Sequence, residues 1–157
     1  MAKLKEGGIA PGFELEDQNG KMVKLSDFKG SKVLVYFYPK AGTPGCTKQA
    51  CSVRDNLGEL SELGIEAIGI SGDAVKRQKK FDDKNGLGFR LLSDSEVKVA
   101  NAWGVLGEKS MYGKRYIGII RSAFLIDEEG KVEGAWYKIK PLETVEKVLA
   151  SVKGGVG

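Results

Sequence analysis

The stretch VLVYFYPKAGTPGCTKQAC, residues 33–51, carries the clearest structural signal in the sequence. Its first part, 33–38, is a continuous apolar run rich in residues that favour β-strands, which suits a central strand covered on both faces. Pro39 ends this run because proline cannot donate a hydrogen bond to a neighbouring strand. A turn segment, 40–45, follows, and Cys46 opens a pattern of helical spacing. The stretch therefore predicts a buried strand that leads through a tight turn into a helix.

The predicted helix starts at Pro44, with Thr43 as its N-cap, because a proline at the first helical position loses no hydrogen bond. Gly64 is a natural stop, and the apolar stretch 65–71 is predicted to form a second buried strand. A strand–helix–strand unit of this kind is typical of a parallel pair of strands. One face of the helix is apolar, and its members recur every three or four residues: Cys46, Ala50, Val53, Leu57 and Leu60.

Shorter elements are predicted on both sides of this unit. They are an N-terminal β-hairpin at 13–25, helices at 74–84 and 95–103, a second hairpin at 122–137, and a last helix from Pro141. Asp94 or Ser95 is the expected N-cap of the helix at 95–103. The apolar side of the last helix is expected to begin at Leu142, and the glycine-rich end, 154–157, is expected to fray. No repeat or linker divides the chain, so one α/β domain spanning residues 1–157 is predicted.

The composition is that of a folded protein. Of the 157 residues, 41% are hydrophobic and 29% are charged, and the formal net charge is +4. The basic residues are interleaved with 21 acidic ones, and the densest basic cluster, 76–80, is interpreted as a solvated helix face rather than a phosphate-binding patch. The longest apolar run is far shorter than the ~20 residues that span a bilayer, and the start MAKLKEGG has no signal-peptide pattern. We therefore expect a cytoplasmic protein without a nucleic-acid or membrane partner.

The sequence contains no histidine and only two cysteines, Cys46 and Cys51. Without an imidazole, neither a Cys-His nor a Ser-His-Asp arrangement can operate. A structural zinc site is not expected either, because too few ligands are present. Two cysteines five residues apart in a cytosolic protein indicate redox chemistry more than a structural disulfide.

Cys46 is the candidate nucleophile. A free thiol has a pKa of about 8.5, and the thiolate is the nucleophilic form. The first turn of a helix favours an anion through its unpaired N–H groups and the helix dipole, and Thr43 can offer a hydroxyl to the sulfur or to a bound peroxide. The alternative interpretation is that Cys46 is a small apolar residue of the core.

Cys51 is the candidate second thiol. Five residues along an ideal helix separate two Cα atoms by roughly 8.7 Å, whereas a disulfide needs less than about 7 Å. Cys51 lies on the polar side of the predicted helix, so Cys46 faces inward and Cys51 outward. If the two cysteines form a disulfide, the first turns of the helix must unwind. The alternative is that Cys51 is a passive surface thiol.

These features predict a thiol peroxidase. The Cys46 thiolate attacks a hydroperoxide and becomes a sulfenic acid, Cys51 then forms a disulfide with it, and an external dithiol reduces the disulfide. The chemistry requires no metal, flavin or haem, so we expect no cofactor.

The chain resembles the bacterioferritin-comigratory (Q-type) peroxiredoxins. The similarity runs from about residue 5 to 150 and departs from the family at Ala123, where threonine is common. The similarity includes Ala10-Pro11 near the start of the chain. It is clearest in three further segments: Phe37-Tyr38-Pro39-Lys40 with the helix 43–55, Glu108-Lys109-Ser110-Met111-Tyr112-Gly113-Lys114, and Arg121-Ser122-Ala123-Phe124-Leu125-Ile126-Asp127.

The resemblance implies a thioredoxin-like fold, a central mixed β-sheet flanked by helices with an N-terminal β-hairpin. It implies antioxidant reduction of hydrogen peroxide and organic hydroperoxides, with thioredoxin or a similar dithiol protein as the reductant. It makes Cys46 the peroxidatic and Cys51 the resolving cysteine. It also makes Pro39 a shield for the thiolate, Thr43 a hydroxyl donor and Arg121 the distant guanidinium, and it suggests a monomer or weak homodimer.

Two other functions remain open from the sequence. A thioredoxin-like disulfide oxidoreductase would carry two residues between its cysteines, whereas four separate them here. A non-enzymatic, chaperone-like protein could keep the same fold without turnover. Consumption of peroxide by the reduced protein distinguishes both from a peroxidase.

Overall fold

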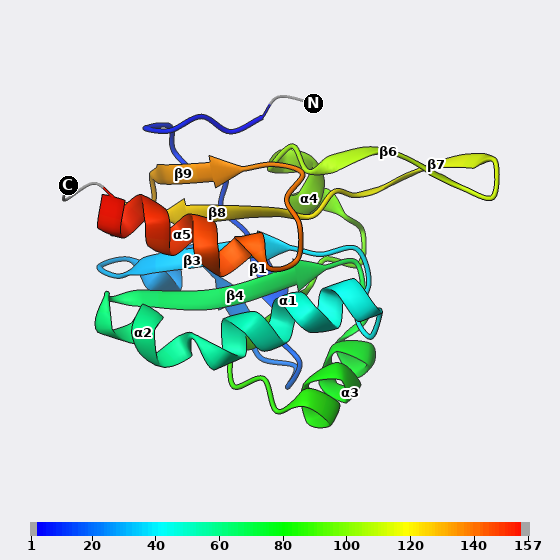
Figure 1. The fold of residues 1–157 in the computed structure, drawn as a ribbon, viewed down its shortest axis with the longest axis horizontal. Helices are drawn as coiled ribbons and strands as arrows, with labels where there is room; N and C mark the ends of the chain where they lie inside the picture. Colours follow the sequence, from blue (N-terminus) through cyan, green and yellow to red (C-terminus); the bar gives the residue numbers. More distant parts are fainter. Residues whose placement is uncertain (1–2, 155–157) are drawn as a thin grey trace.

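A mixed sheet forms the centre of the computed structural model, which describes residues 3–154 (Figure 1). Its seven strands lie in the order β2-β1-β5-β4-β3-β8-β9. The strands are β1 (Glu14–Glu16), β2 (Met22–Lys24), β3 (Lys32–Phe37), β4 (Ile65–Ser71), β5 (Arg90–Ser93), β8 (Ser122–Ile126) and β9 (Val132–Trp136). The remaining elements are the two-stranded hairpin of β6 (Leu106–Met111) and β7 (Lys114–Ile119), the helices α1 (Pro44–Asp55), α2 (Leu57–Glu62), α3 (Val75–Asn85), α4 (Lys98–Ala102) and α5 (Glu143–Gly154), and the 3-10 helix η1 (Leu25–Phe28).

The central position of β3 follows from its apolar sequence. β3 pairs in parallel with β4 and antiparallel with β8, so both of its edges are covered. Its side chains alternate between two separate cores: Val33, Val35 and Phe37 pack on one side of the sheet, and Leu34 and Tyr36 on the other. The predicted buried strand and its parallel partner at 65–71 are confirmed.

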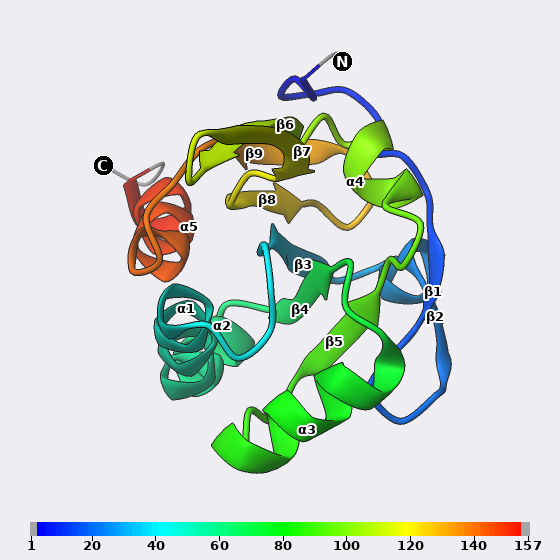
Figure 2. The ribbon, with the colours of Figure 1, turned by 90° about the vertical axis from the view of Figure 1, so that its right-hand side faces the viewer.

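Helices cover both faces of the sheet (Figure 2). On one face lie α1, α2, α3 and α5, whose buried residues share a core that includes Cys46. On the other face α4 packs with the N-terminal segment around the fully buried Trp103. The cysteine-bearing helix α1 thus lies against the sheet on the same side as α5, and its first turn follows directly from the end of β3.

The single helix predicted from residue 44 to Gly64 is wrong. The chain leaves helical geometry at Asn56, which separates α1 from α2. The Asn56 side chain donates a hydrogen bond to the Ser52 carbonyl at 2.7 Å. Asparagine competes in this way with the backbone for hydrogen bonds, and this explains a break that apolar spacing alone does not reveal.

Other expectations are confirmed with shifted ends. Both predicted hairpins are present, as β1–β2 and β8–β9. Asp94 caps the region before α4 by accepting hydrogen bonds from the N–H groups of Val99 and Ala100, but α4 begins only at Lys98. α5 begins at Glu143 instead of Pro141, and Leu142 is exposed rather than part of its apolar side. α5 includes Gly154, and the rest of the predicted frayed end, 155–157, lies outside the described residues.

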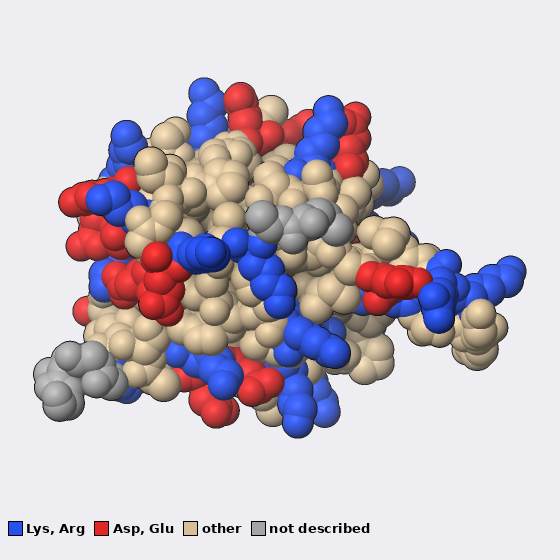
Figure 3. Space-filling model, turned by 90° about the horizontal axis from the view of Figure 1, so that it is seen from above, with Lys and Arg blue, Asp and Glu red and all other residues tan. Residues whose placement is uncertain are grey.

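Two features were not predicted from the sequence. β5 extends the sheet beyond β4, and the β6–β7 hairpin projects from the body of the molecule (Figure 1). Within residues 3–154, no helix is long and apolar enough to cross a bilayer. On the face seen in Figure 3, lysines and arginines alternate with acidic residues over the body of the molecule, which agrees with the mixed charge pattern of the sequence.

Gly69 in β4 supplies a stability test of this packing. A Cβ at Gly69 would lie 2.9 Å from the Tyr36 hydroxyl oxygen, closer than side chains tolerate, whereas a Cβ at Gly58 in α2 would meet nothing within 4 Å. We expect Gly69→Ala to lower the free energy of unfolding by about 1–3 kcal/mol through overpacking. The matched Gly58→Ala should leave it unchanged or raise it by up to about 1 kcal/mol. Urea unfolding measures both, and equal effects of the two substitutions would contradict the packing described.

Candidate active site

Cys46 occupies the first turn of α1. Pro44 is the first helical residue, and the first intrahelical hydrogen bond runs from the Thr47 N–H to the Thr43 carbonyl at 2.9 Å. The N–H groups of Gly45 and Cys46 precede this bond, so they have no partner within the helix. Together with the helix dipole they favour a negative charge at this point.

The surroundings of Cys46 are not purely apolar. The side chain is buried, with 1% exposed, and packs in the core beneath α1. The Arg121 guanidinium nevertheless lies within reach, with Nη1 3.6 Å from the Cys46 sulfur. A positive charge beside a thiol stabilises its thiolate. Burial alone would agree with the alternative that Cys46 is a structural residue of the core. The contact with a guanidinium does not agree with it.

Arg121 is held in place by Gln49, which the sequence analysis did not single out. Gln49 is fully buried; its Oε1 accepts a hydrogen bond from Arg121 Nη1 at 2.6 Å, and its Nε2 donates to the Thr144 hydroxyl at 2.7 Å. These hydrogen bonds connect the segment just before β8 with α1 and α5. The signal in the sequence is a polar residue one helical turn after Cys46 on an otherwise apolar face.

Gly45 allows the guanidinium to approach the helix. A Cβ at this position would lie 3.0 Å from Arg121 Nη2 and 3.5 Å from Pro141 Cγ. Any larger residue would therefore press against the arginine. Arg121 itself lies just before β8, and its carbonyl accepts a hydrogen bond from the Ile139 N–H at 2.9 Å, which fixes its backbone.

Thr43 has the predicted position but a different set of hydrogen bonds. It is the N-cap of α1, yet its side chain makes no capping bond. The hydroxyl instead donates to the Lys40 carbonyl at 2.9 Å, so in this structure it does not donate to the sulfur. Pro39 is half-buried at the end of β3, and the following loop is anchored by the bond from the Ala41 N–H to Asp73 at 2.7 Å.

Cys51 lies on a different side of α1 from Cys46. It is half-buried, and its sulfur is 4.0 Å from the Asn85 side-chain oxygen at the end of α3. Arg54 donates to the Asn85 carbonyl at 2.7 Å and so connects the same two helices. Both cysteines are free thiols, and α1 is intact between them. This is the arrangement expected for the state before any disulfide forms.

Two further titratable side chains surround the site. Burial raises the pKa of Tyr36 well above its usual value, and the neighbouring Tyr38 raises it further. Its hydroxyl has no hydrogen-bond partner among the described residues. Partial burial lowers the pKa of Lys109 on β6, and the positive charge of Arg121 lowers it further. The β6–β7 hairpin therefore brings a second cation toward the guanidinium.

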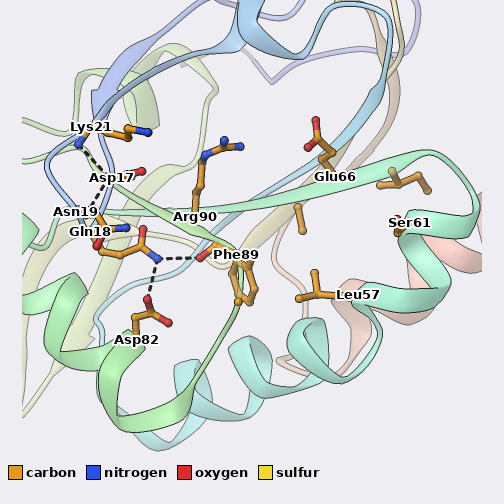
Figure 4. A pocket seen from close by; sticks show the side chains of 13 residues that line it. Asp17, Gln18, Asn19, Lys21, Leu57, Ser61, Glu66, Asp82, Phe89 and Arg90 are labelled. Carbon is orange, nitrogen blue, oxygen red and sulfur yellow. Dashed lines mark hydrogen bonds between the residues drawn. The ribbon is translucent and has the colours of Figure 1, made fainter.

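A separate hollow of about 630 Å³ lies away from the cysteines, between the β1–β2 turn, β5 and α2 (Figure 4). Gln18 lies beside it and is almost completely buried. Its amide donates to Asp82 and to the Phe89 carbonyl, and its oxygen accepts from the Leu91 N–H. These bonds satisfy Gln18 and attach the turn to β5 and α3. The bonds therefore explain why the Gln18 side chain is buried beside the hollow.

A family model described as the AhpC/TSA family matches residues 7–135. The chain belongs to the AhpC/TSA family. This peroxiredoxin is 50% identical over 153 residues to peroxiredoxin Bcp of Escherichia coli K12, with 98% of each chain covered. It is 49% identical over 146 residues to a putative peroxiredoxin of Mycobacterium tuberculosis H37Rv, with 93% of each chain covered.

Solved structures agree with this assignment. A mutant of PrxQ from Xylella fastidiosa superposes with a TM-score of 0.92 at 30% identity, with all of both chains covered. Peroxiredoxin Q of Xanthomonas campestris gives a TM-score of 0.85 at 38% identity, with 90% of each chain covered. The predicted thioredoxin-like fold and Q-type family are confirmed. This peroxiredoxin is accordingly a thiol peroxidase, and neither the disulfide oxidoreductase nor the chaperone-like alternative is favoured.

Removing Gln49 tests the hydrogen-bond chain behind Arg121. Gln49→Leu leaves the guanidinium without its buried acceptor, and a hydrogen bond to a charged group is worth about 1.5–3 kcal/mol. We expect the rate of reaction with hydrogen peroxide, measured by stopped-flow fluorescence, to fall by about tenfold or more, and the midpoint of its pH–rate profile to move to higher pH.

Two matched variants serve as controls for this test. Gln49→Glu keeps an acceptor for Arg121 but adds a negative charge beside the sulfur, so the midpoint of its pH–rate profile should move to higher pH even though Arg121 stays in place. Thr144→Val removes only the outer hydrogen bond and should have the smaller effect. A Gln49→Leu variant with the rate and pH profile of the unmodified protein would show that the chain does not position Arg121.

Proposed function

We propose that Cys46 is the peroxidatic cysteine and Cys51 the resolving cysteine of this peroxidase. The observation that carries the proposal is the 3.6 Å contact between the Arg121 guanidinium and the Cys46 sulfur, at the start of a helix, in a chain without histidine. Helix terminus and guanidinium together provide what an imidazole provides elsewhere, namely a positive environment for a thiolate.

In the first step the Cys46 thiolate attacks one oxygen of the hydroperoxide. A sulfur–oxygen bond forms, the oxygen–oxygen bond breaks, and the other oxygen leaves with the electron pair and takes up a proton. The sulfur is oxidised to a sulfenic acid, and the leaving oxygen becomes water when the substrate is hydrogen peroxide or an alcohol when it is an organic hydroperoxide. Arg121 stabilises the negative charge that moves from the sulfur to the leaving oxygen.

Thr43 and Pro39 complete the environment of the sulfur. The Thr43 hydroxyl, which donates to Lys40 in the structure, can rotate to donate to a bound peroxide without moving the backbone. Pro39 lies half-buried at the end of β3 and shields the thiolate from water. Neither role involves a metal or an organic cofactor.

In the second step the Cys51 thiolate attacks the sulfenic sulfur. A disulfide forms, and the oxygen leaves as water. Because Cys51 lies on another side of α1, beside Asn85, the first turns of α1 must unwind before the two sulfurs meet. A dithiol protein of the thioredoxin type then restores both thiols by exchange.

The proposal also includes the cellular location, the domain organisation and the assembly of the protein. We place it in the cytoplasm, where dithiol proteins keep thiols reduced. We treat residues 1–157 as one domain, supported by the single seven-stranded sheet with helices on both faces. A monomer or weak homodimer is the assembly proposed, and nucleic acid and membrane are not proposed as partners.

Serine substitutions separate the two cysteine roles. Cys46→Ser should abolish peroxide consumption in the presence of a dithiol, because no other group can take the nucleophile's role. Cys51→Ser should still react with one equivalent of peroxide but should lose sustained thioredoxin-linked turnover. Peroxide consumption and intact mass are the measurements. Activity that survives Cys46→Ser would overturn the proposed mechanism, and full thioredoxin-linked turnover by Cys51→Ser would overturn the role of Cys51.

Hydrogen exchange tests the unwinding of α1. Formation of the disulfide should lower amide protection over residues 46–52, because the helix cannot remain intact while the two sulfurs are bonded. The parallel strand β4 serves as an internal reference and should keep its protection. Equal protection of residues 46–52 in the reduced and oxidised proteins would contradict the proposed opening.

A further inference from the structure

We propose that the groove between α3 and the start of α1 is the docking site for an acidic surface of the dithiol protein that reduces this peroxidase. The inference rests on the proposed Cys46–Cys51 disulfide, because only an oxidised enzyme needs this partner. The groove has a volume of about 820 Å³. Its walls are formed by Ala41, Gly42, Thr47, Gly72, Asp73, Ala74, Lys76, Arg77, Lys80, Phe81, Lys84 and Asn85.

One wall of the groove carries a row of positive charges. Lys76, Lys80 and Lys84 are four residues apart on α3, so they lie on one face of the helix, and all three are exposed. Among residues 3–154, no carboxylate lies within 4.0 Å of any of their ammonium groups. Like charges at this spacing destabilise a helix. An anionic partner would therefore relieve the repulsion between these three lysines.

The acidic residues nearest this wall are already engaged. Asp73 pairs with Arg77 at 3.4 Å and also accepts hydrogen bonds from Ala41 and Ser71. Asp83 pairs with Lys79 at 3.0 Å. The lysine row thus differs from the rest of the α3 surface, where cations and carboxylates neutralise each other. The initial interpretation of 76–80 as a merely solvated helix face does not account for this difference.

The opposite wall belongs to the redox site. Ala41 and Gly42 precede α1, and Thr47 directly follows Cys46. Asn85 closes the end of the groove and contacts the Cys51 sulfur at 4.0 Å. Neither cysteine is among the residues that line the groove while α1 is intact, but Cys51 borders the groove through Asn85. We therefore expect the disulfide to become accessible to a thiolate from this side once the first turns of α1 unwind.

The chemistry of the groove favours a protein surface over a small anion. The largely buried polar side chain of Asp73 in the lining is a carboxylate that is already bonded to Ala41, Ser71 and Arg77, so it offers no donor to a small anion. The three ammonium groups are exposed. Such charges act by steering an oppositely charged surface and raise association rates rather than build a tight small-molecule pocket. The occupant that fits is a dithiol protein with carboxylates around its nucleophilic cysteine.

Charge reversal in the groove tests this proposal. The variant combines Lys76→Glu, Lys80→Glu and Lys84→Glu. Its control combines Lys5→Glu, Lys24→Glu and Lys29→Glu, which change the net charge equally at exposed positions outside the groove. Two synthetic dithiol peptides serve as probes, with the same Cys-Gly-Pro-Cys core flanked by aspartates in one and by lysines in the other. The measurement is the second-order rate of reduction of the disulfide at low ionic strength, followed by fluorescence.

We expect the unmodified protein and the control to react faster with the acidic peptide by about tenfold or more, with a preference that declines as salt is added. The groove variant should lose or invert this preference, and should lose thioredoxin-linked turnover by a similar factor. An acidic-peptide preference equal in the groove variant and the unmodified protein would overturn the proposal. Inorganic phosphate and a short oligonucleotide should also be tested as competitors. If either one abolishes the preference as fully as the substitutions do, the proposal is also overturned, because the groove would then bind a small anion or a nucleic acid.

The small reductant dithiothreitol separates this proposal from the proposed function. It should reduce the disulfide of all three proteins at similar rates, since its reacting thiolate carries a single charge and no extended acidic surface that the lysine row could attract. If no Cys46–Cys51 disulfide forms in the unmodified protein, the proposed function fails. If the disulfide forms and dithiothreitol reduces it, but charge reversal has no effect on the peptides, only the docking site fails.

Discussion

The contact between the Arg121 guanidinium and the Cys46 sulfur, at 3.6 Å, is the interaction on which the rest of the site depends. A chain without histidine has few other ways to hold a thiolate at neutral pH. Three separate features serve this contact. Gly45 leaves room for the guanidinium, Gln49 accepts a hydrogen bond from it, and Thr144 fixes Gln49 from α5. Because these groups come from the segment just before β8, from α1 and from α5, the site exists only when the helices are packed on the sheet.

In the proposed mechanism the same helix has to satisfy two opposing demands. An intact first turn of α1 serves the attack on peroxide, since it supplies the N–H groups beside the sulfur. An opened first turn is needed for the disulfide, since Cys51 lies on another side of the helix next to Asn85. Asp73 anchors the loop before α1, and α1 ends at Asn56, so the proposed opening would lie between these two points. On this view the groove beside α3 receives the reductant only after the helix has opened.

The sequence predicted the parts of the fold that depend on local pattern. The apolar run of β3, the proline after it and the spacing from Cys46 to Leu60 identified the strand–helix–strand unit, because burial on both faces imposes those residue types. The family resemblance, and not the spacing, identified Arg121. Gln49 was missed because its partner Thr144 is 95 residues away, and such a pairing depends on how α5 packs against α1. The β6–β7 hairpin was missed because strand pairing rather than a buried apolar face defines it. The break at Asn56 arises from a side-chain hydrogen bond that apolar spacing does not encode.

The most direct test of the central claim is the ultraviolet absorbance of the thiolate in Cys51→Ser, where Cys46 is the only thiol. Its titration should be compared with that of the double variant that also carries Arg121→Ala. The account predicts thiolate absorbance at pH 7 in the single variant, together with reaction with peroxide, and a smaller thiolate fraction at the same pH in the double variant. A Cys46 thiol that is neutral and unreactive toward peroxide at pH 7, or a titration that does not change with Arg121, would contradict it.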